Sequence, residues 1–150
     1  MPNTNMKSAY LEDLITQKIH ELPADYQERI IGRDENCDII TLAQDTKVSK
    51  LQALIIHLGK RGNESIELKR LPNASEMYIG TQENPLQIPV PIGEKNQKGI
   101  SINYNTYITI GENNYQFVLR DYNYIKQKKE LEDKFRACDT GEIPIGLKSK

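Results

Sequence analysis

The feature that most constrains this chain is the regular interruption of short apolar groups by turn-forming residues. From Ala9 to about Tyr122, clusters of Pro, Gly, Asn, Asp and Ser separate the apolar groups. These clusters lie at residues 23–25, 34–36, 43–45, 59–63, 72–75, 83–85 and 111–114. Such residues favour turns, each for its own conformational reason, so the spacing predicts many short strands. It favours an all-β sandwich or barrel.

Several of the apolar groups show the period of two that is typical of strands. Ile100–Tyr104 alternates fully, Tyr107–Ile110 alternates more weakly, and Ile66–Leu71 alternates for four residues before it slips. Leu51–Leu58 is nearly all apolar. An apolar run of this length predicts a central strand that is covered on both faces.

Two hairpins are predicted from the turn clusters between these groups. Residues 59–63 are expected to join a strand at 51–58 to one at 64–71, and residues 111–114 to join 106–110 to 115–120. Residues 9–22 fit either one helical stripe or two short strands, 9–15 and 17–22, and periodicity alone does not choose between them.

The two ends of the chain differ from the middle. Residues 1–8 are polar and are expected to be disordered, and residues 139–150 are expected to form a flexible tail. Residues 123–138 predict a helix, with Asp121 or Asn123 as its cap. Its stripe of Tyr124, Leu131, Phe135 and Cys138 is expected to pack inward against the domain.

Composition excludes several classes of protein. The 150 residues suit one domain, and 20 Lys and Arg against 21 Asp and Glu give a formal net charge of -1. That balance argues against sequence-blind nucleic-acid binding, which needs a basic face. No apolar run approaches the roughly 18 residues of a membrane span, and no signal-peptide pattern is present. We expect a cytoplasmic protein that contacts neither membrane nor nucleic acid.

Residues that could carry catalysis or bind metal are few. Neither His20 nor His57 stands near a nucleophile in a recognisable setting, so both are expected to be strand histidines satisfied by a neighbour. Cys37 and Cys138 lack the CxxC spacing and are expected to be small apolar fillers. We therefore expect no enzyme, no metal and no cofactor.

Three polar loops together contain the groups that an anion site needs. Arg33 follows Gly32 at the end of an apolar group, Ser49 precedes the long strand, and Asn73 lies in the loop after strand 64–71. If the strands bring these loops to one end of a sandwich, a guanidinium, a hydroxyl and an amide form an anion cradle. Lys47 and Lys50 would raise the local positive potential.

These motifs, in this order, resemble a forkhead-associated (FHA) domain over residues 9–122. Residues 30–39, Ile-Ile-Gly-Arg-Asp-Glu-Asn-Cys-Asp-Ile, resemble the opening signature of that family, and residues 48–55 resemble its Ser-x-x-His block. Asn73-Ala74-Ser75 resembles its Asn-Gly-Thr turn, and residues 107–117 resemble its closing hairpin. The resemblance also favours two strands over a helix at 9–22.

The resemblance implies a sandwich of about eleven strands in two mainly antiparallel sheets, with the predicted helix at its C-terminal end. It implies a module that binds phosphothreonine peptides through the loops at one end and has no catalytic activity. By this resemblance Arg33 and Ser49 contact the phosphate, and Asn73 holds the peptide backbone. Lys47, Lys50 and Ser75 complete the expected phosphopeptide-binding set. The expected role is that of an adaptor in a signalling or secretion assembly.

The sequence departs from the family pattern within these motifs. Gln52 replaces a His that supports the pocket, Ala74 replaces a Gly, and Ser75 replaces a Thr. Gln both donates and accepts hydrogen bonds, so Gln52, together with Gly32, is expected to support the loops. Ala74 would be strained if the turn needs a positive φ at that position. These departures keep an alternative open, an FHA-like scaffold that binds a partner protein independently of phosphorylation.

Overall fold

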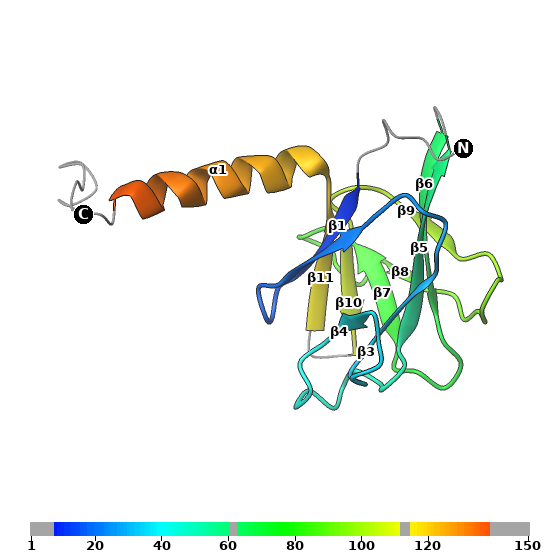
Figure 1. Ribbon diagram of the computed structural model, residues 1–150. Helices are drawn as coiled ribbons and strands as arrows, with labels where there is room; N and C mark the ends of the chain where they lie inside the picture. Colours follow the sequence, from blue (N-terminus) through cyan, green and yellow to red (C-terminus); the bar gives the residue numbers. More distant parts are fainter. Residues whose placement is uncertain (1–7, 61–62, 112–114, 139–150) are drawn as a thin grey trace.

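The computed structural model shows a β-sandwich with a helix at one end (Figure 1). It describes residues 8–60, 63–111 and 115–138. The predicted tail at 139–150 lies outside the described residues, as do all but the last residue of the predicted disordered segment 1–8.

The described residues form eleven strands in two sheets, as predicted. The first sheet has the order β2-β1-β11-β10-β7-β8, and the second has the order β4-β3-β5-β6-β9. The strands of the first sheet are β1 Ala9–Asp13, β2 Ile19–Leu22, β7 Met77–Gly80, β8 Ile88–Pro89, β10 Tyr107–Ile110 and β11 Tyr115–Arg120. Those of the second are β3 Arg29–Gly32, β4 Ile39–Ile40, β5 Ala53–Lys60, β6 Asn63–Arg70 and β9 Ile100–Ile102. Named strands pair antiparallel, except that β4 runs parallel to β3.

The predicted central strand is present, but its start was placed too early. β5 lies between β3 and β6, begins at Ala53 and not at Leu51, and leaves the Leu51 residue 51% exposed. The first hairpin is also tighter than predicted, because Gly59 pairs with Glu64 inside the ladder. The ladder extends to Lys60 and Asn63, and residues 61–62 between them lie outside the described residues.

The core lies between the two sheets and is built from alternate strand residues. The ladder puts every second side chain on the inner face, which explains why isolated apolar residues in the sequence become fully buried. The first sheet contributes Leu11, Leu22, Met77, Ile79, Ile108, Ile110, Tyr115, Phe117 and Leu119, and the second contributes Ile31, Ile39, Ala53, Ile55, Ile66, Leu68 and Ile102.

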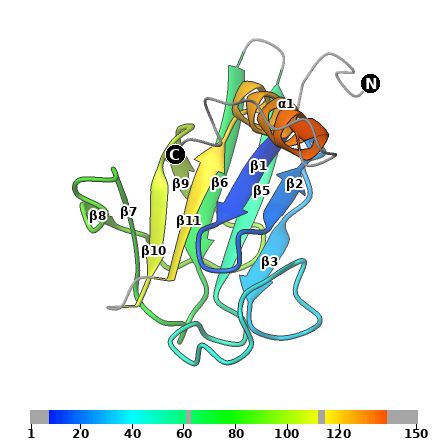
Figure 2. The same ribbon diagram turned by 90° about the vertical axis from the view of Figure 1, so that its left-hand side faces the viewer.

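The helix α1, Tyr122–Cys138, begins where β11 ends and extends away from the sandwich (Figure 1). A view turned by 90° shows it at one end of the two sheets (Figure 2). The carboxylate of Asp121 accepts a hydrogen bond from the Tyr124 N–H at 2.8 Å, so Asp121 is the cap. None of the described helices is long and apolar enough to cross a membrane.

The prediction that the helical stripe packs inward is wrong for its second half. Leu131 is 55% exposed and Phe135 is 49% exposed, because the helix runs beyond the edge of the sandwich. The first turns contact the body, where the Arg120 guanidinium carbon lies 4.2 Å from the centre of the Tyr124 ring. The side chain of Cys138 lies outside the described residues.

Candidate functional site

Three loops meet at the end of the sandwich opposite α1 (Figure 1). They are the segment after β3, the segment before β5, and residues 71–76 between β6 and β7. The Arg33 N–H donates to the Ser49 carbonyl at 3.2 Å, and the Leu71 N–H donates to the Gln52 carbonyl at 3.0 Å. The structure therefore places the segments containing Arg33, Ser49 and Asn73 at one end, as the resemblance implied.

Gly32 allows the first two of these segments to approach closely. A Cβ at this position would lie 2.1 Å from the carbonyl oxygen of Lys50, which is closer than Cβ atoms approach other atoms in real proteins. The expected support by Gly32 thus has a steric basis. Any larger residue would push the end of β3 away from the loop that contains Ser49.

Gln52 joins two of the loops through one buried side-chain amide. Its Oε1 accepts the Ser49 N–H at 2.9 Å, and its Nε2 donates to the Ser75 carbonyl at 2.7 Å. The Gln52 residue is fully buried, so both hydrogen bonds are at least partly shielded from water. Because an amide has a donor and an acceptor at fixed positions, Gln52 holds the two loops at a defined separation.

The hydroxyls of Ser49 and Ser75 lie directly above this crosslink. The Ser75 N–H donates to the Ser49 Oγ at 2.9 Å, and the two Oγ atoms are 3.1 Å apart. The Ser49 hydroxyl therefore accepts from the backbone, and either of the two hydroxyls can donate its proton to the other. Two hydroxyls and the loop backbone form a compact polar cluster.

The Arg33 side chain is fixed to the loop that contains Ser49. Its Nε donates to the Val48 carbonyl at 2.6 Å. Among the described residues no carboxylate forms an ion pair with Arg33, and its two terminal nitrogens donate no hydrogen bond. An arginine stays charged at any physiological pH, so a half-buried positive charge remains open to an external anion.

The strain expected at Ala74 is absent, because another residue takes the left-handed conformation of this turn. Asn73 has φ of 68°, and Ala74 is not among the described residues with positive φ. Asn is one of the few residues with a side chain that adopts this region readily. The exchange of Gly for Ala therefore costs the turn nothing, and the exposed Asn73 stands at the outer edge of the loop.

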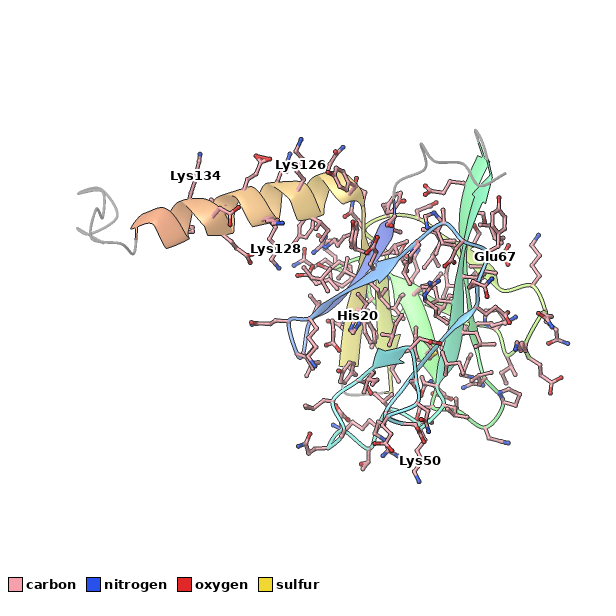
Figure 3. The ribbon with its side chains drawn as sticks, in the orientation of Figure 1. His20, Lys50, Glu67, Lys126, Lys128 and Lys134 are labelled. Atoms are coloured by element: carbon pink, nitrogen blue, oxygen red, sulfur yellow. The ribbon has the colours of Figure 1, made fainter. Side chains whose placement is uncertain are left out.

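The two predicted lysines occupy different places. Lys50 is exposed at the loop end and its side chain points away from the sandwich (Figure 3). The stem of Lys47 instead lies beside Gly111, at the hairpin between β10 and β11. No hydrogen bond within the described part of the chain connects the Lys47 side chain to Ser49 or Arg33.

Sequence reasoning missed two residues of this end. The fully buried Val48 supplies the carbonyl that fixes Arg33, and Cys37 donates its thiol to the Lys50 carbonyl at 3.3 Å. Cys37 is thus more than an apolar filler, and burial raises the pKa of its thiol. An isolated apolar residue such as Val48 in the polar segment 43–50 is the signal that could have found an anchor.

The two histidines lie on strands away from these loops. His57 is a satisfied strand histidine, as expected: its Nδ1 lies 2.9 Å from the Leu22 carbonyl and its Nε2 lies 2.5 Å from Glu64. The expectation is wrong for His20, whose buried Nε2 has no partner among the described residues. Burial lowers the pKa of His20 and so favours its neutral form.

Known proteins resemble this chain in structure and not in sequence. No family model matches the sequence, and no curated protein matches it. Mycobacterium tuberculosis EmbR, solved with a low-affinity phosphopeptide, superposes with a TM-score of 0.51 and 21% identity, over 80% of this chain and 26% of that chain. This chain therefore spans about a quarter of the EmbR chain.

Two isolated FHA domains are matched over nearly their whole length. The FHA domain of human APLF, in complex with an XRCC1 bisphospho peptide, superposes with a TM-score of 0.56 and 15% identity, over 76% of this chain and 98% of that one. The N-terminal FHA domain of S. cerevisiae Rad53p, in complex with a phosphothreonine peptide, superposes with a TM-score of 0.54 and 19% identity. The match covers 80% of this chain and 98% of that one. This protein has the fold of an FHA domain.

Proposed function

We propose that this protein is a protein-interaction module that binds phosphothreonine peptides through Arg33, Ser49 and the neighbouring loops. The observation that carries the proposal is the state of Arg33. Its guanidinium is held by the Val48 carbonyl and lacks a carboxylate partner among the described residues, and its backbone N–H is bonded to the carbonyl of Ser49.

The chemistry of a phosphate suits these groups. A phosphothreonine carries about -1.5 to -2 charges at neutral pH and three strong acceptor oxygens. The terminal nitrogens of Arg33 offer a planar fork to two of those oxygens, and the Ser49 hydroxyl offers a further donor. Such charge-assisted hydrogen bonds are roughly twice as strong as neutral ones.

The remaining predicted residues have supporting roles in the proposal. The exposed amide of Asn73 binds the main chain of the peptide, while Lys50, with Lys47 farther away, adds positive potential at this end. Ser75 and Gln52 hold the loops in place. The peptides bound in the solved EmbR, APLF and Rad53p complexes support the choice of ligand, and an adaptor role follows if binding is the only activity.

The test is a titration against a degenerate phosphothreonine peptide library and its unphosphorylated counterpart. We expect Arg33→Ala to weaken phosphopeptide binding at least tenfold, about 1.4 kcal/mol, while the thermal unfolding midpoint changes little. Lys134→Ala is the matched control, because it also removes one positive charge but lies on α1, far from the loops (Figure 3). Equal affinity for phosphorylated and plain peptides would end the proposal.

A further inference from the structure

Arg70 lies at the same end of the sandwich as Arg33, on the inner face of the second sheet. It is the last residue of β6, directly before the loop that contains Asn73 and Ser75. In the ladder Arg70 stands opposite Ala53, and Leu68 stands opposite Ile55. Residues opposite one another in an antiparallel pair share a face, so Arg70 points to the same side as these core residues.

The charge of Arg70 has no partner among the residues that the structure describes. Its Nε is buried and makes no hydrogen bond to any described residue. Its terminal nitrogens also donate no hydrogen bond to a described residue, but unlike Nε they reach the surface. A buried, unpaired charge is costly, and a guanidinium in this state favours contact with an anion.

The other described arginines show that the lack of a carboxylate partner is unusual in this molecule. Among the arginines whose side chains the structure describes, Arg29 pairs with Asp25 at 2.7 Å and Arg120 pairs with Glu12 at 3.0 Å. Only Arg33 and Arg70 lack a carboxylate partner there. Both unpaired arginines lie at the end where the three loops meet.

The register of the sheet gives the distance between these two arginines. Ile31, Ala53 and Arg70 lie opposite one another on three adjacent strands, and Arg33 follows Ile31 by two residues. With strands about 4.8 Å apart and a rise of about 3.3 Å per residue, the two arginine Cα atoms are about 12 Å apart. A separation of this size would allow the two side chains to contact separate groups of one peptide.

The backbone of Arg70 is fixed on both sides. Its N–H donates to the Pro91 carbonyl at 2.9 Å, and its carbonyl accepts the Gly93 N–H at 2.9 Å. The guanidinium thus extends from a rigid backbone position. This favours a defined binding geometry, unlike that of a flexible charged side chain on the surface.

We propose that Arg70 forms a second anion subsite, which binds a carboxylate or a second phosphate on the peptide whose phosphothreonine contacts Arg33. This inference rests on the proposed function and names the class of ligand more closely. The preferred partner then contains two anionic side chains near each other in sequence.

The experiment uses the full chain and three sets of synthetic peptides. The first set has one phosphothreonine in degenerate neutral flanks, the second adds one Asp at varied positions on either side, and the third adds a second phosphothreonine instead. We expect at least one position to raise the affinity of the unmodified protein about fivefold or more, and Arg70→Gln to abolish that gain. Arg70→Gln is expected to bind the singly phosphorylated set within about twofold of the unmodified protein.

The outcomes separate the two proposals and the two sources of negative charge. A gain with Asp assigns the subsite to a carboxylate, whereas a gain with the second phosphothreonine alone assigns it to phosphate. If no position raises affinity, or if Arg70→Gln retains the gain, the subsite is refuted while binding of the first set keeps the proposed function. Lys134→Gln is the charge control. If Arg70→Gln unfolds, Arg70→Lys keeps the charge without the fork, and an unchanged gain in that variant would refute recognition through the guanidinium.

Discussion

The two ends of the sandwich use positive charge in opposite ways. At the helix end, Arg120 and Lys128 both donate to the Glu12 carboxylate, at 3.0 and 2.9 Å, and Arg120 also lies over the Tyr124 ring. At the loop end, Arg33 and Arg70 lack any carboxylate partner among the described residues. Cations that are neutralised internally stabilise the fold, whereas unpaired cations on a rigid frame remain available for a ligand.

The two ends are also held together by different kinds of interaction. Ionic contacts attach α1 to β1, and in Figure 3 the Lys128 side chain points from the helix toward the sandwich while those of Lys126 and Lys134 point away from it. The loop end is held by neutral hydrogen bonds through Gln52 and Ser49. Neutral crosslinks order the loops without adding negative charge at the end where we propose that an anion binds.

The largest effect on stability and binding is expected from removing the neutral crosslink formed by Gln52. This variant tests the difference between the two ends most directly. Gln52→Leu leaves a buried N–H and a buried carbonyl without partners, so we expect the free energy of unfolding to fall by about 2–3 kcal/mol. Phosphopeptide binding should be lost as well. Urea denaturation measures the first and titration the second. The exposed Gln82→Leu serves as control, and a change below about 0.5 kcal/mol in the Gln52 variant would show that the amide does not hold the loops.

A smaller effect is expected at the ionic contacts of the helix end. Burial opposes the charge of Glu12, but the hydrogen bonds from Lys128 and Arg120 outweigh it and hold the pKa of this carboxyl below its usual value. We expect Glu12→Gln to lower the free energy of unfolding by about 1 kcal/mol at neutral pH and to leave peptide binding unchanged.

This effect has a defined dependence on pH. A carboxyl whose pKa is lower in the folded state contributes stability above its unfolded pKa, about 4.3, and loses it as the pH falls through the lower folded value. The difference between the two proteins should therefore shrink below about pH 4. Denaturation at a series of pH values tests this, and a constant difference from pH 7 to pH 2 would contradict the ionic origin.

The smallest effect is expected on the second half of α1. Leu131 and Phe135 are half-exposed, so the double change to Ser should alter the free energy of unfolding by less than about 0.5 kcal/mol. A matched change of the buried Leu119 to Ser should cost several times more. A large loss from the helix variant in thermal unfolding would mean that this face is covered by something in the intact protein.

The sandwich fold and the approximate positions of many strands could be predicted from the sequence because turn residues and alternation are local patterns. Turn residues mark where strands end, and the Gly32-Arg33 pair stands out against its apolar surroundings. The start of β5 was missed because Leu51 is apolar yet belongs to a loop that is held by the Gln52 backbone. Apolar character alone does not reveal whether a residue pairs with a neighbouring strand.

Features that depend on distant contacts were not predictable. Which residue of the 71–76 turn takes the left-handed conformation is decided by loop packing, and Asn73 takes it instead of Ala74. The exposure of Leu131 and Phe135 depends on the direction in which α1 leaves β11, for which the helical stripe has no information. Arg70 is unpaired because no described carboxylate forms an ion pair with it. The sequence does not show which carboxylates lie near Arg70, because this depends on how the two sheets pack.

The amide of Gln52 also bears on the speed and entropy of association. Two loops distant in the chain are already joined in the free protein. If the proposed function holds, peptide binding need not order these loops, and the entropic cost falls mainly on the peptide. Such a receptor is expected to associate in a single kinetic step, at a rate set by encounter and by long-range attraction, and so to respond strongly to ionic strength.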